Sequence, residues 1–344
     1  MGSEKMIPAN LERAVYGMYA THALRVADRH GVFEHLTRHG GDSAEKIAAA
    51  LSVDEDTLER LLLVLASFGV LDAEDGRYAL AAGVRPYVDR EDPRYLMGFV
   101  DHLIDDTAGQ FGRLDGYLRV GKAETDRDVP APFESLYRDD ESVGRFLNAM
   151  WGLSHHVSHE LAALADLGDS RRLIDVGGAS GPFSVAALHA FPQLRSTVFD
   201  LPQVGPHLIA RAVEHKLDDR LDFAAGDFFR DPLPAGDCFA FGYILSDWDD
   251  ETCAALLRKA YEACLPGGRV LIMERLFDDD RGGPLATAVM NLSMHVETEG
   301  RHRTAAEYLE LLRRAGFTDG TVRRSGGDKH LVIGRRRTES EAGR

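Results

Sequence analysis

A glycine-rich loop offers the clearest chemistry in the sequence. The stretch Asp175-Val-Gly-Gly-Ala-Ser-Gly181 follows the apolar pair Leu173-Ile174 and precedes a helix-like run. Glycines at 177 and 178 permit positive φ angles and let a ligand approach the backbone closely. A helix that begins at the carboxyl end of a strand also presents free N–H groups, and open α/β sheets bind ligands at that edge. The loop therefore predicts a cofactor site, although such a loop alone does not identify the cofactor.

Two further acidic residues stand at the ends of the next two predicted strands. Asp200 ends one strand 23 residues beyond Gly177, and an acidic residue at about that spacing commonly accepts hydrogen bonds from ribose hydroxyls. The plainer interpretation of Asp200 is a helix N-cap before Leu201-Pro202. Asp227 and Phe228 end the third strand, where a carboxylate could accept a hydrogen bond from an adenine amino group and the aromatic ring could cover the base. These positions favour a cofactor that contains a nucleoside.

Strands that alternate with helices must position these residues. From Arg171 onward the sequence has strand-like runs at 171–178, 196–202, 221–229, 238–245, 269–277 and 329–337, with helical stretches between them. This alternation predicts an α/β fold with a doubly wound, largely parallel sheet.

The chain before this region has a different pattern. Apolar residues recur at helical spacing over about the first 70 residues, and Ser43 and Asp54 stand where helices should begin. Two short apolar pieces then flank Asp75-Gly76, a strong hairpin signal. Three helices followed by a β-wing predict a winged helix. Residues 90–168 are helical again and rich in aromatic side chains, with a break expected at 122–132.

Composition and charge restrict the class of protein. The chain has 344 residues and a formal charge of −16, and this acidic balance disfavours nucleic-acid binding despite the winged-helix pattern. Its three cysteines form no CxxC pair, so a disulfide framework or a cysteine zinc site is not expected. The start has no signal-peptide pattern and no apolar run is long enough to span a membrane. We therefore expect a cytoplasmic protein with reduced thiols that binds neither nucleic acid nor membrane.

The ordered motifs resemble those of the class I small-molecule O-methyltransferases. The family's order and spacing are matched by LIDVGGASG, VFDLP, GDFF, SDWDDE, PGGRVLIMERL and TEGRHRTAAEYLELLRRAGF. The pattern is similar to the plant caffeate-type enzymes and, more closely, to the acetylserotonin (hydroxyindole) O-methyltransferases. DFFRDPLP and DDDRGGPL…MHVETEGRHRT carry the second likeness. The resemblance covers essentially the whole chain.

The resemblance implies a fold and a domain organisation. We expect an α/β fold class, with a doubly wound Rossmann-like methyltransferase sheet preceded by an all-helical winged-helix dimerisation domain. The expected boundaries are 1–90 for the dimerisation domain, 91–168 for a helical connector that lines the acceptor pocket, 169–337 for the catalytic domain and 338–344 for a flexible tail. The expected partners are a small aromatic substrate and a second copy of the chain. A homodimer would also explain why the helix around 11–27 has more apolar positions than one small domain can bury.

The resemblance also implies S-adenosylmethionine, rather than NAD, as the cofactor. It places Gly177 and its neighbours by the methionine part, and Asp200 on the ribose. Asp227, Phe228 and Trp248 would surround the adenine. The expected cofactor-binding residues are Asp175, Gly177, Gly178, Asp200, Leu201, Asp227, Phe228, Tyr243 and Trp248.

The catalytic residues depart from the family pattern. Methylation of a phenol requires a methyl sulfonium held in line with the oxygen, and a base assists removal of the phenolic proton. In the resembling family the base is a histidine just before Asp-Trp, steered by two acidic residues. Here Ser246 precedes Asp247, Glu274 keeps one acidic position, and His302 takes the other. Our hypothesis is that His302 is the base, oriented by Glu274; the alternative is that His302 is a surface loop residue and no side-chain base exists.

Acceptor-binding residues are expected on two segments. Phe146, Met150 and Trp151 match the acceptor-lining helix of the family, although helical spacing is also that of an ordinary core. In the second segment Glu297, near His295, could pair with a substrate ammonium or a phenol unless it points to solvent. The expected set is Phe146, Met150, Trp151, Met290, Ser293, Met294, His295 and Glu297. Asp247, His295, His302 and Glu297 show no HxH or HxxxH spacing that would support a metal, although distant ligands could converge; no metal is expected.

Four functions compete on these observations. The favoured one is transfer of a methyl group to the hydroxyl of a small phenolic molecule, amino-acid-like or polyketide, in secondary metabolism. The missing histidine keeps two others open: C-methylation of an aromatic ring or α-keto acid, and a non-methylating reaction by a cofactor-binding family member. A DNA-binding regulator is disfavoured by the acidic charge and by the complete cofactor motifs.

Overall fold

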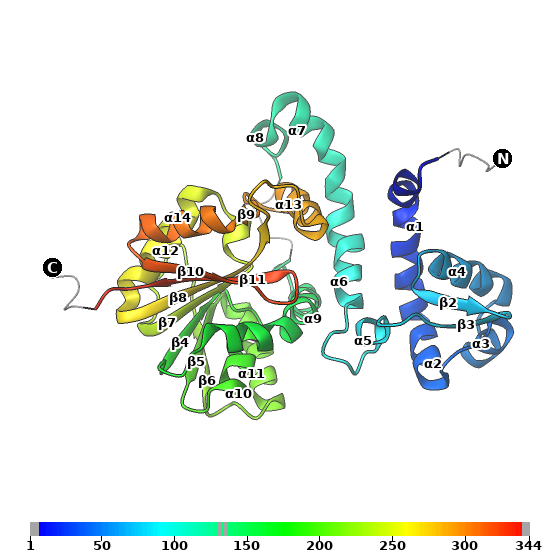
Figure 1. Cartoon of the computed structure of the whole chain (residues 1–344), viewed down its shortest axis with the longest axis horizontal. Coiled ribbons are helices and arrows are strands. Elements are labelled where there is room, and N and C mark those ends of the chain that lie inside the picture. Colours follow the sequence, from blue (N-terminus) through cyan, green and yellow to red (C-terminus); the bar gives the residue numbers. More distant parts are fainter. Residues whose placement is uncertain (1–6, 130–132, 134–135, 339–344) are drawn as a thin grey trace. The chain divides into compact units, whose positions relative to one another are not determined.

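The computed structural model describes residues 7–129, 133 and 136–338. The chain divides into two compact units, Met1–Asp106 and Thr107–Arg344 (Figure 1). Each unit has its own hydrophobic core. Two expectations, the proline-bearing part of the helix break at 130–132 and the flexible tail beyond 338, lie outside the described residues.

The first unit is helical apart from one small sheet. Its helices are α1 (Ala9–Arg29), α2 (Val32–His39), α3 (Ala44–Leu51), α4 (Glu55–Ser67), α5 (Arg85–Val88) and α6 (Met97–His102). Strands β1 (Asp42–Ser43), β2 (Leu71–Glu74) and β3 (Arg77–Leu80) pair in the antiparallel order β1-β3-β2.

Local sequence explains where these elements begin and turn. The side chains of Ser43 and Asp54 accept hydrogen bonds from backbone N–H groups of α3 and α4, which confirms both predicted N-caps. Asp75 and Gly76 both have positive φ angles, +49° and +74°, and join β2 to β3. Two such residues form a type I′ turn, whose twist matches that of a hairpin, so the predicted wing is confirmed.

The second unit is a sheet covered by helices on both faces. After a π-helical turn (Leu103–Thr107) and a 3₁₀ helix (Ala108–Arg113), its helices are α7 (Leu114–Val120), α8 (Lys122–Thr125), α9 (Asp140–Ala165), α10 (Pro182–Ala190), α11 (Gly205–Glu214), α12 (Asp250–Ala263), α13 (Leu285–Glu297) and α14 (Ala305–Ala315). One core cluster joins α9, α10 and α11 to one face of the sheet, and another joins α12 and α14 to the opposite face (Figure 1). The short helix α8 lies at the start of the stretch 122–132, where only a break was expected.

The sheet is largely parallel, as the sequence predicts. Its strands are β4 (Arg172–Val176), β5 (Arg195–Asp200), β6 (Leu221–Ala225), β7 (Gly236–Gly242), β8 (Cys264–Phe277), β9 (Arg303–Thr304), β10 (Thr318–Arg323) and β11 (Lys329–Arg335). The order is β10-β11-β8-β7-β4-β5-β6, with β9 beside β8, and β11 runs antiparallel to both of its neighbours. The edge strand β10 was not predicted, because its mostly exposed polar residues lack a strand pattern.

The topology fixes where a ligand can bind. From β4 the chain moves outward through β5 and β6, then returns to place β7 on the other side of β4. Strand order therefore reverses between β4 and β7, and the carboxyl ends of these two strands form the switch point at which open α/β sheets bind ligands.

Candidate functional site

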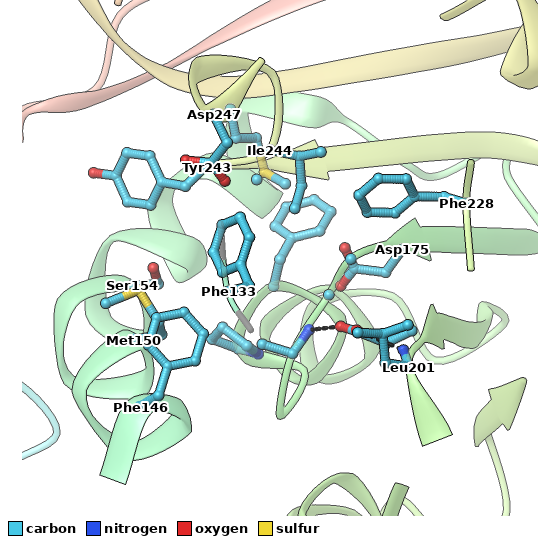
Figure 2. Close-up of a pocket in the computed structure, with 18 of the residues that line it drawn as sticks. Phe133, Phe146, Met150, Ser154, Asp175, Leu201, Phe228, Tyr243, Ile244 and Asp247 are labelled. Atoms are coloured by element: carbon cyan, nitrogen blue, oxygen red, sulfur yellow. Dashed lines mark hydrogen bonds between the residues drawn. The ribbon is translucent and has the colours of Figure 1, made fainter. Parts of the chain in front are cut away.

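A cavity of about 300 Å³ lies at this switch point. It is lined by all nine of the residues predicted to bind the cofactor, namely Asp175, Gly177, Gly178, Asp200, Leu201, Asp227, Phe228, Tyr243 and Trp248. In Figure 2, Phe146, Met150 and Ser154 lie on one side of the cavity, and Leu201 and Phe228 lie on the other. The structure thus brings together residues from four strand ends and from α9.

The glycine loop is shaped by close packing. Gly177 has a φ of +66°, and a Cβ atom there would lie 2.4 Å from Cδ1 of Ile244. A Cβ atom on Gly178 would lie 2.6 Å from the carboxyl carbon of Asp175. Only glycine fits at these two positions, because any side chain would clash with Ile244 or Asp175. The two glycines therefore set the shape of the loop and let a ligand approach its backbone closely.

Asp200 ties this loop to the end of β5. Its carboxylate accepts hydrogen bonds from Ala179 N at 2.9 Å and from Leu201 N at 2.7 Å. Burial raises its pKa to about 6, although both backbone bonds lower it. The 3₁₀ turn that follows has no side-chain cap, so the N-cap interpretation gains no support. A buried carboxylate with lone pairs to spare is suited to ribose hydroxyls.

Asp175, at the start of the loop, is also held by hydrogen bonds. Its Oδ2 accepts a hydrogen bond from the hydroxyl of Ser184 at 2.7 Å, and Ser196 donates in turn to Ser184 at 2.8 Å. Burial raises the pKa of Asp175 to about 6. The chain of hydroxyls connects β4 and β5 to the first turn of α10 and fixes the orientation of this carboxyl.

A cluster of three aromatic side chains, Phe228, Phe229 and Trp248, lies at the ends of β6 and β7. Phe229 is edge-on to Trp248 with ring centroids 4.7 Å apart, and Phe228 lies 4.6 Å from Phe229. Trp248 Nε1 is buried with no hydrogen-bond partner within the described part of the chain. Asp227 accepts a hydrogen bond from Phe229 N at 2.8 Å. Phe229 was not among the predicted residues, although the repeated aromatic in Asp227-Phe-Phe was a usable signal.

Helix α9 contributes one stripe of residues to the cavity. Phe146, Met150, Ser154 and Ser158 all line it, and each stands four positions from the next, so they share one helix face. Phe146 and Met150 were predicted from the sequence, whereas the two serines were not, although the same spacing would have identified them. Trp151 lies outside this cavity, because adjacent helix positions point about 100° apart; it stacks on His155, with ring centroids 4.3 Å apart.

The residues predicted on α13 do not line this cavity. This set comprises Met290, Ser293, Met294, His295 and Glu297, and their helix packs against the 3₁₀ helix Ala108–Arg113 and strand β8 instead. The ring of His295 meets Tyr117 edge-on at 5.3 Å. Ser293 Oγ donates to Glu297 Oε1 at 2.5 Å.

The four predicted catalytic residues are all buried. Asp247 lines the cavity, whereas Ser246, Glu274 and His302 do not. Glu274 Oε1 accepts a hydrogen bond from Ser246 N at 3.1 Å. His302 Nδ1 and Glu274 Oε2 have no hydrogen-bond partner among the described residues, so the expected bond between these atoms is not formed. His302 is 3% exposed, which rules out the alternative that it is a surface loop residue.

Burial shifts the pKa values of these groups in opposite directions. The pKa of Asp247 is raised well above its usual value by burial and by the negative charges of Glu274 and Glu297. Burial also raises the pKa of Glu274 to about 7, against the opposing effect of Lys329. Burial lowers the pKa of His302 to about 4, so its imidazole is neutral at pH 7.

Arg303 holds the loop that carries Asp247, a role that was not predicted from the sequence. Its fully buried guanidinium donates to Leu245 O at 2.7 Å and to Trp248 O at 2.8 Å. It also donates to Asp250 Oδ1 at 2.8 Å. The turn between β7 and α12 is therefore fixed from the segment around residue 303, and Asp247 is held rigidly at the cavity wall.

Comparison with known proteins identifies the family. The model of the O-methyltransferase domain matches residues 114–318, and that of the O-methyltransferase dimerisation domain matches residues 13–88. The chain belongs to the O-methyltransferase family. This confirms the enzyme class predicted from the motifs, an S-adenosylmethionine-dependent methyltransferase, and the dimerisation domain supports self-association.

This methyltransferase aligns with individual relatives over nearly its whole length. It is 35% identical over 317 residues to a 3-hydroxy-5-methyl-1-naphthoate 3-O-methyltransferase of Streptomyces sahachiroi, covering 91% of this chain and 90% of that protein. It is 32% identical over 318 residues to the acetylserotonin O-methyltransferase of Gallus gallus, covering 89% and 91%. The crystal structure of human N-acetylserotonin methyltransferase with S-adenosylmethionine superposes with a TM-score of 0.86 at 28% identity, covering 98% of this chain and 100% of that one.

The cavity fits the cofactor of this family, S-adenosylmethionine. Buried carboxylates at the ends of β4 and β5 suit hydroxyl and ammonium groups, and the aromatic group at the ends of β6 and β7 suits a purine ring. Within the ranges that the structure describes, no cluster of three or more potential ligands could hold a metal ion. No described helix is both long and apolar enough to cross a membrane.

Proposed function

We propose that this methyltransferase transfers a methyl group from S-adenosylmethionine to a hydroxyl of a small aromatic molecule. The observation that carries the proposal is the wall of the cavity formed by Phe133, Tyr137, Phe146 and Met150, which adjoins the cofactor residues. Flat ring substrates pack favourably against aromatic side chains. The naphthoate and acetylserotonin O-methyltransferases among the relatives support this substrate class.

The chain contributes mainly by positioning the two reactants. S-adenosylmethionine supplies, when bound, a methyl group on a positively charged sulfur. The glycine loop is fixed by Asp200, and the Asp247 turn is fixed by Arg303, so the cofactor and acceptor sides of the cavity are both rigid. Holding two reactants in a reactive geometry accelerates a bimolecular step without other chemistry.

We place Asp247 at the hydroxyl of the substrate as the proton acceptor. Its carboxyl lines the cavity, and its raised pKa makes it a stronger base than an ordinary aspartate. His302, the base predicted from the sequence, is the second candidate, because its buried ring is neutral and Nδ1 has no partner among the described residues. Glu274 would then orient His302 only after a side-chain rearrangement.

Two variants decide between these bases. We expect Asp247→Asn to lower turnover by about 10²–10⁴-fold, the usual effect of general base catalysis, and His302→Ala to lower it less than tenfold. In the wild type, turnover should rise with pH through the raised pKa of Asp247, and this limb should vanish in Asp247→Asn. A large loss in His302→Ala alone would place the base at His302, and small losses in both would favour methyl transfer by positioning alone.

The reaction itself is tested with a panel of hydroxylated naphthoates and indoles. Mass spectrometry and NMR of the product distinguish a methyl on oxygen, a methyl on carbon and no methyl at all. We expect a methyl ether, and we expect the matched compounds without a hydroxyl group to be unreactive. Methylation of carbon, or consumption of substrate without methylation, would contradict the proposal in favour of the two alternative activities.

The assembly that we propose is a homodimer. One face of α1 exposes apolar side chains at helical spacing, including Leu11, Val15, Met18 and Tyr19, and Met18 and Tyr19 are 63% and 60% exposed. A contiguous apolar patch of this kind usually marks an interface. The match of residues 13–88 to a dimerisation domain supports a second copy of the chain as the partner.

A further inference from the structure

A buried lysine lines the wall of the cofactor cavity. Lys329 is the first residue of β11, pairs in register with Arg275 of β8, and is only 4% exposed. Within the described part of the chain, its ammonium makes no hydrogen bond or ion pair, and its close contact is the ring face of Tyr243, 3.9 Å from Nζ. Burial lowers its pKa to about 8, so the charged form still predominates at pH 7. The negative charges of the buried Glu274 and Asp175 act on this ammonium, but among the described residues neither carboxyl forms an ion pair with it. A buried ammonium without a hydrogen-bond acceptor costs several kcal/mol, which points to a ligand that supplies one.

The neighbouring strand end is shaped to admit this ammonium. A Cβ atom on Gly242 would lie 3.2 Å from Nζ of Lys329, so a larger residue there would press on the cation. Tyr243 has a φ of +57°, a conformation that residues with a side chain rarely adopt, and its N–H donates to Met273 O at 3.1 Å. Strained backbone of this kind tends to occur at functional sites.

The charges that line the cavity complement those of the cofactor. Four carboxyls line the cavity, those of Asp175, Asp200, Asp227 and Asp247, and among the described lining residues Lys329 is the single cation. S-adenosylmethionine carries a sulfonium, an ammonium and a carboxylate. The acidic residues suit the first two groups, and the carboxylate requires a donor or a positive charge.

Several donors of the glycine loop are already engaged. Gly177 N donates to Phe199 O at 2.9 Å, and Ala179 N donates to Asp200 at 2.9 Å. The hydroxyl and the backbone N–H of Ser184, in the first turn of α10, both bond to Asp175. Fewer donors of the loop are therefore left for the carboxylate of the ligand, and Lys329 offers it a positive charge on the same cavity wall.

We propose that Lys329 binds the carboxylate of the cofactor's methionine part, with the Tyr243 ring supporting the ammonium from its other side. This inference rests on the cofactor of the proposed function and not on the methyl acceptor. It makes Lys329 a recognition residue for the amino-acid end of the cofactor, supplied by the last strand of the sheet.

Binding measurements without any acceptor test the proposal. By titration calorimetry we expect Lys329→Met to weaken binding of S-adenosylhomocysteine by about tenfold to a hundredfold, the effect of one charge-assisted hydrogen bond. Binding of 5′-methylthioadenosine, which has the nucleoside but lacks the amino-acid part, should stay within twofold of wild type. Equal losses for both ligands would show a structural role, and no loss for S-adenosylhomocysteine would remove Lys329 from the site; either result overturns the proposal.

Two further measurements keep the test decisive if Lys329→Met folds poorly. Wild-type protein should bind decarboxylated S-adenosylmethionine more weakly than S-adenosylmethionine by the same tenfold to hundredfold factor, and equal affinities would refute recognition of the carboxylate. Arg275→Met is the matched control, because Arg275 also faces the Tyr243 ring, at 5.9 Å, but does not line the cavity. The affinity of Arg275→Met for S-adenosylhomocysteine should stay within threefold of wild type. A loss as large as that of Lys329→Met would show that nearby positive charge in general, and not direct contact with Lys329, explains the binding. Failure of the aromatic substrate assignment would leave all of these results unchanged.

Discussion

Replacing Asp200 by asparagine should separate two roles of one carboxylate. In the wild type, one oxygen accepts the N–H of Ala179 at 2.9 Å and the other accepts the N–H of Leu201 at 2.7 Å. Asparagine provides a single oxygen, so one N–H must face an amide NH₂ group and remain unpaired. An unpaired buried donor costs about 1–3 kcal/mol, and the unfolding free energy of the ligand-free protein should fall by that amount.

The same variant should weaken cofactor binding. Loss of a charge-assisted hydrogen bond to ribose costs about 1.5–3 kcal/mol, which corresponds to roughly tenfold to 150-fold in affinity. Titration calorimetry with S-adenosylhomocysteine measures this loss of affinity. Denaturation of the ligand-free protein measures the loss of unfolding free energy. Asp222→Asn is the matched control, since Asp222 is an exposed residue in a surface ion pair with Arg195 and should change neither quantity appreciably. Unchanged affinity in Asp200→Asn would refute the assignment of Asp200 to the ribose.

The raised pKa of Asp200 adds a pH test. Burial raises that pKa to about 6, so the carboxylate predominates above pH 6 and is progressively protonated below it. Protonation removes an acceptor, so affinity for S-adenosylhomocysteine should fall as the pH drops through 6. Because Asp175 has a similar pKa, the Asp200→Asn variant should flatten this dependence only partly. An identical pH dependence in both proteins would contradict the argument.

Two further predictions concern assembly and stability. Met18→Asp or Tyr19→Asp places a charge in the exposed apolar face of α1 and should convert the dimer to a monomer, as measured by light scattering at micromolar concentration; wild-type protein that is already monomeric would contradict the proposed dimer. His155 has a pKa lowered to about 4 by burial and by the nearby His159 and His215. The folded state therefore resists protonation, and the stability that a neutral His155 provides is complete above about pH 6.5 and is lost as the pH falls toward 4. The Tm should fall between pH 7 and pH 5, and His155→Phe should make that fall smaller; an unchanged pH dependence in the variant would exclude His155 as its source.

Much of the cofactor site could be predicted from the sequence because its signals are local. The glycines of the loop and the acidic residues at strand ends have fixed positions relative to their own strands, and parallel strands bring their carboxyl ends to one edge. The N-caps Ser43 and Asp54 and the turn at Asp75-Gly76 depend on a few adjacent residues. For these features, backbone conformation and hydrogen bonding within a few residues determine the outcome.

Other features depended on which segments meet in space. Lys329 reaches the cavity because β11 inserts antiparallel beside β8, and the local sequence around it carries no signal of a ligand. Arg303 fixes a turn more than 50 residues earlier in the chain through backbone carbonyls, which no sequence motif reveals. Glu274 and His302 were predicted to be partners from the resemblance to the family, yet in the fold Glu274 bonds to the backbone of Ser246 instead. Sequence by itself determined which residues could do chemistry at each strand end, and only tertiary packing decided which side chains share a cavity, because orientation and burial arise from contacts between elements distant in the chain.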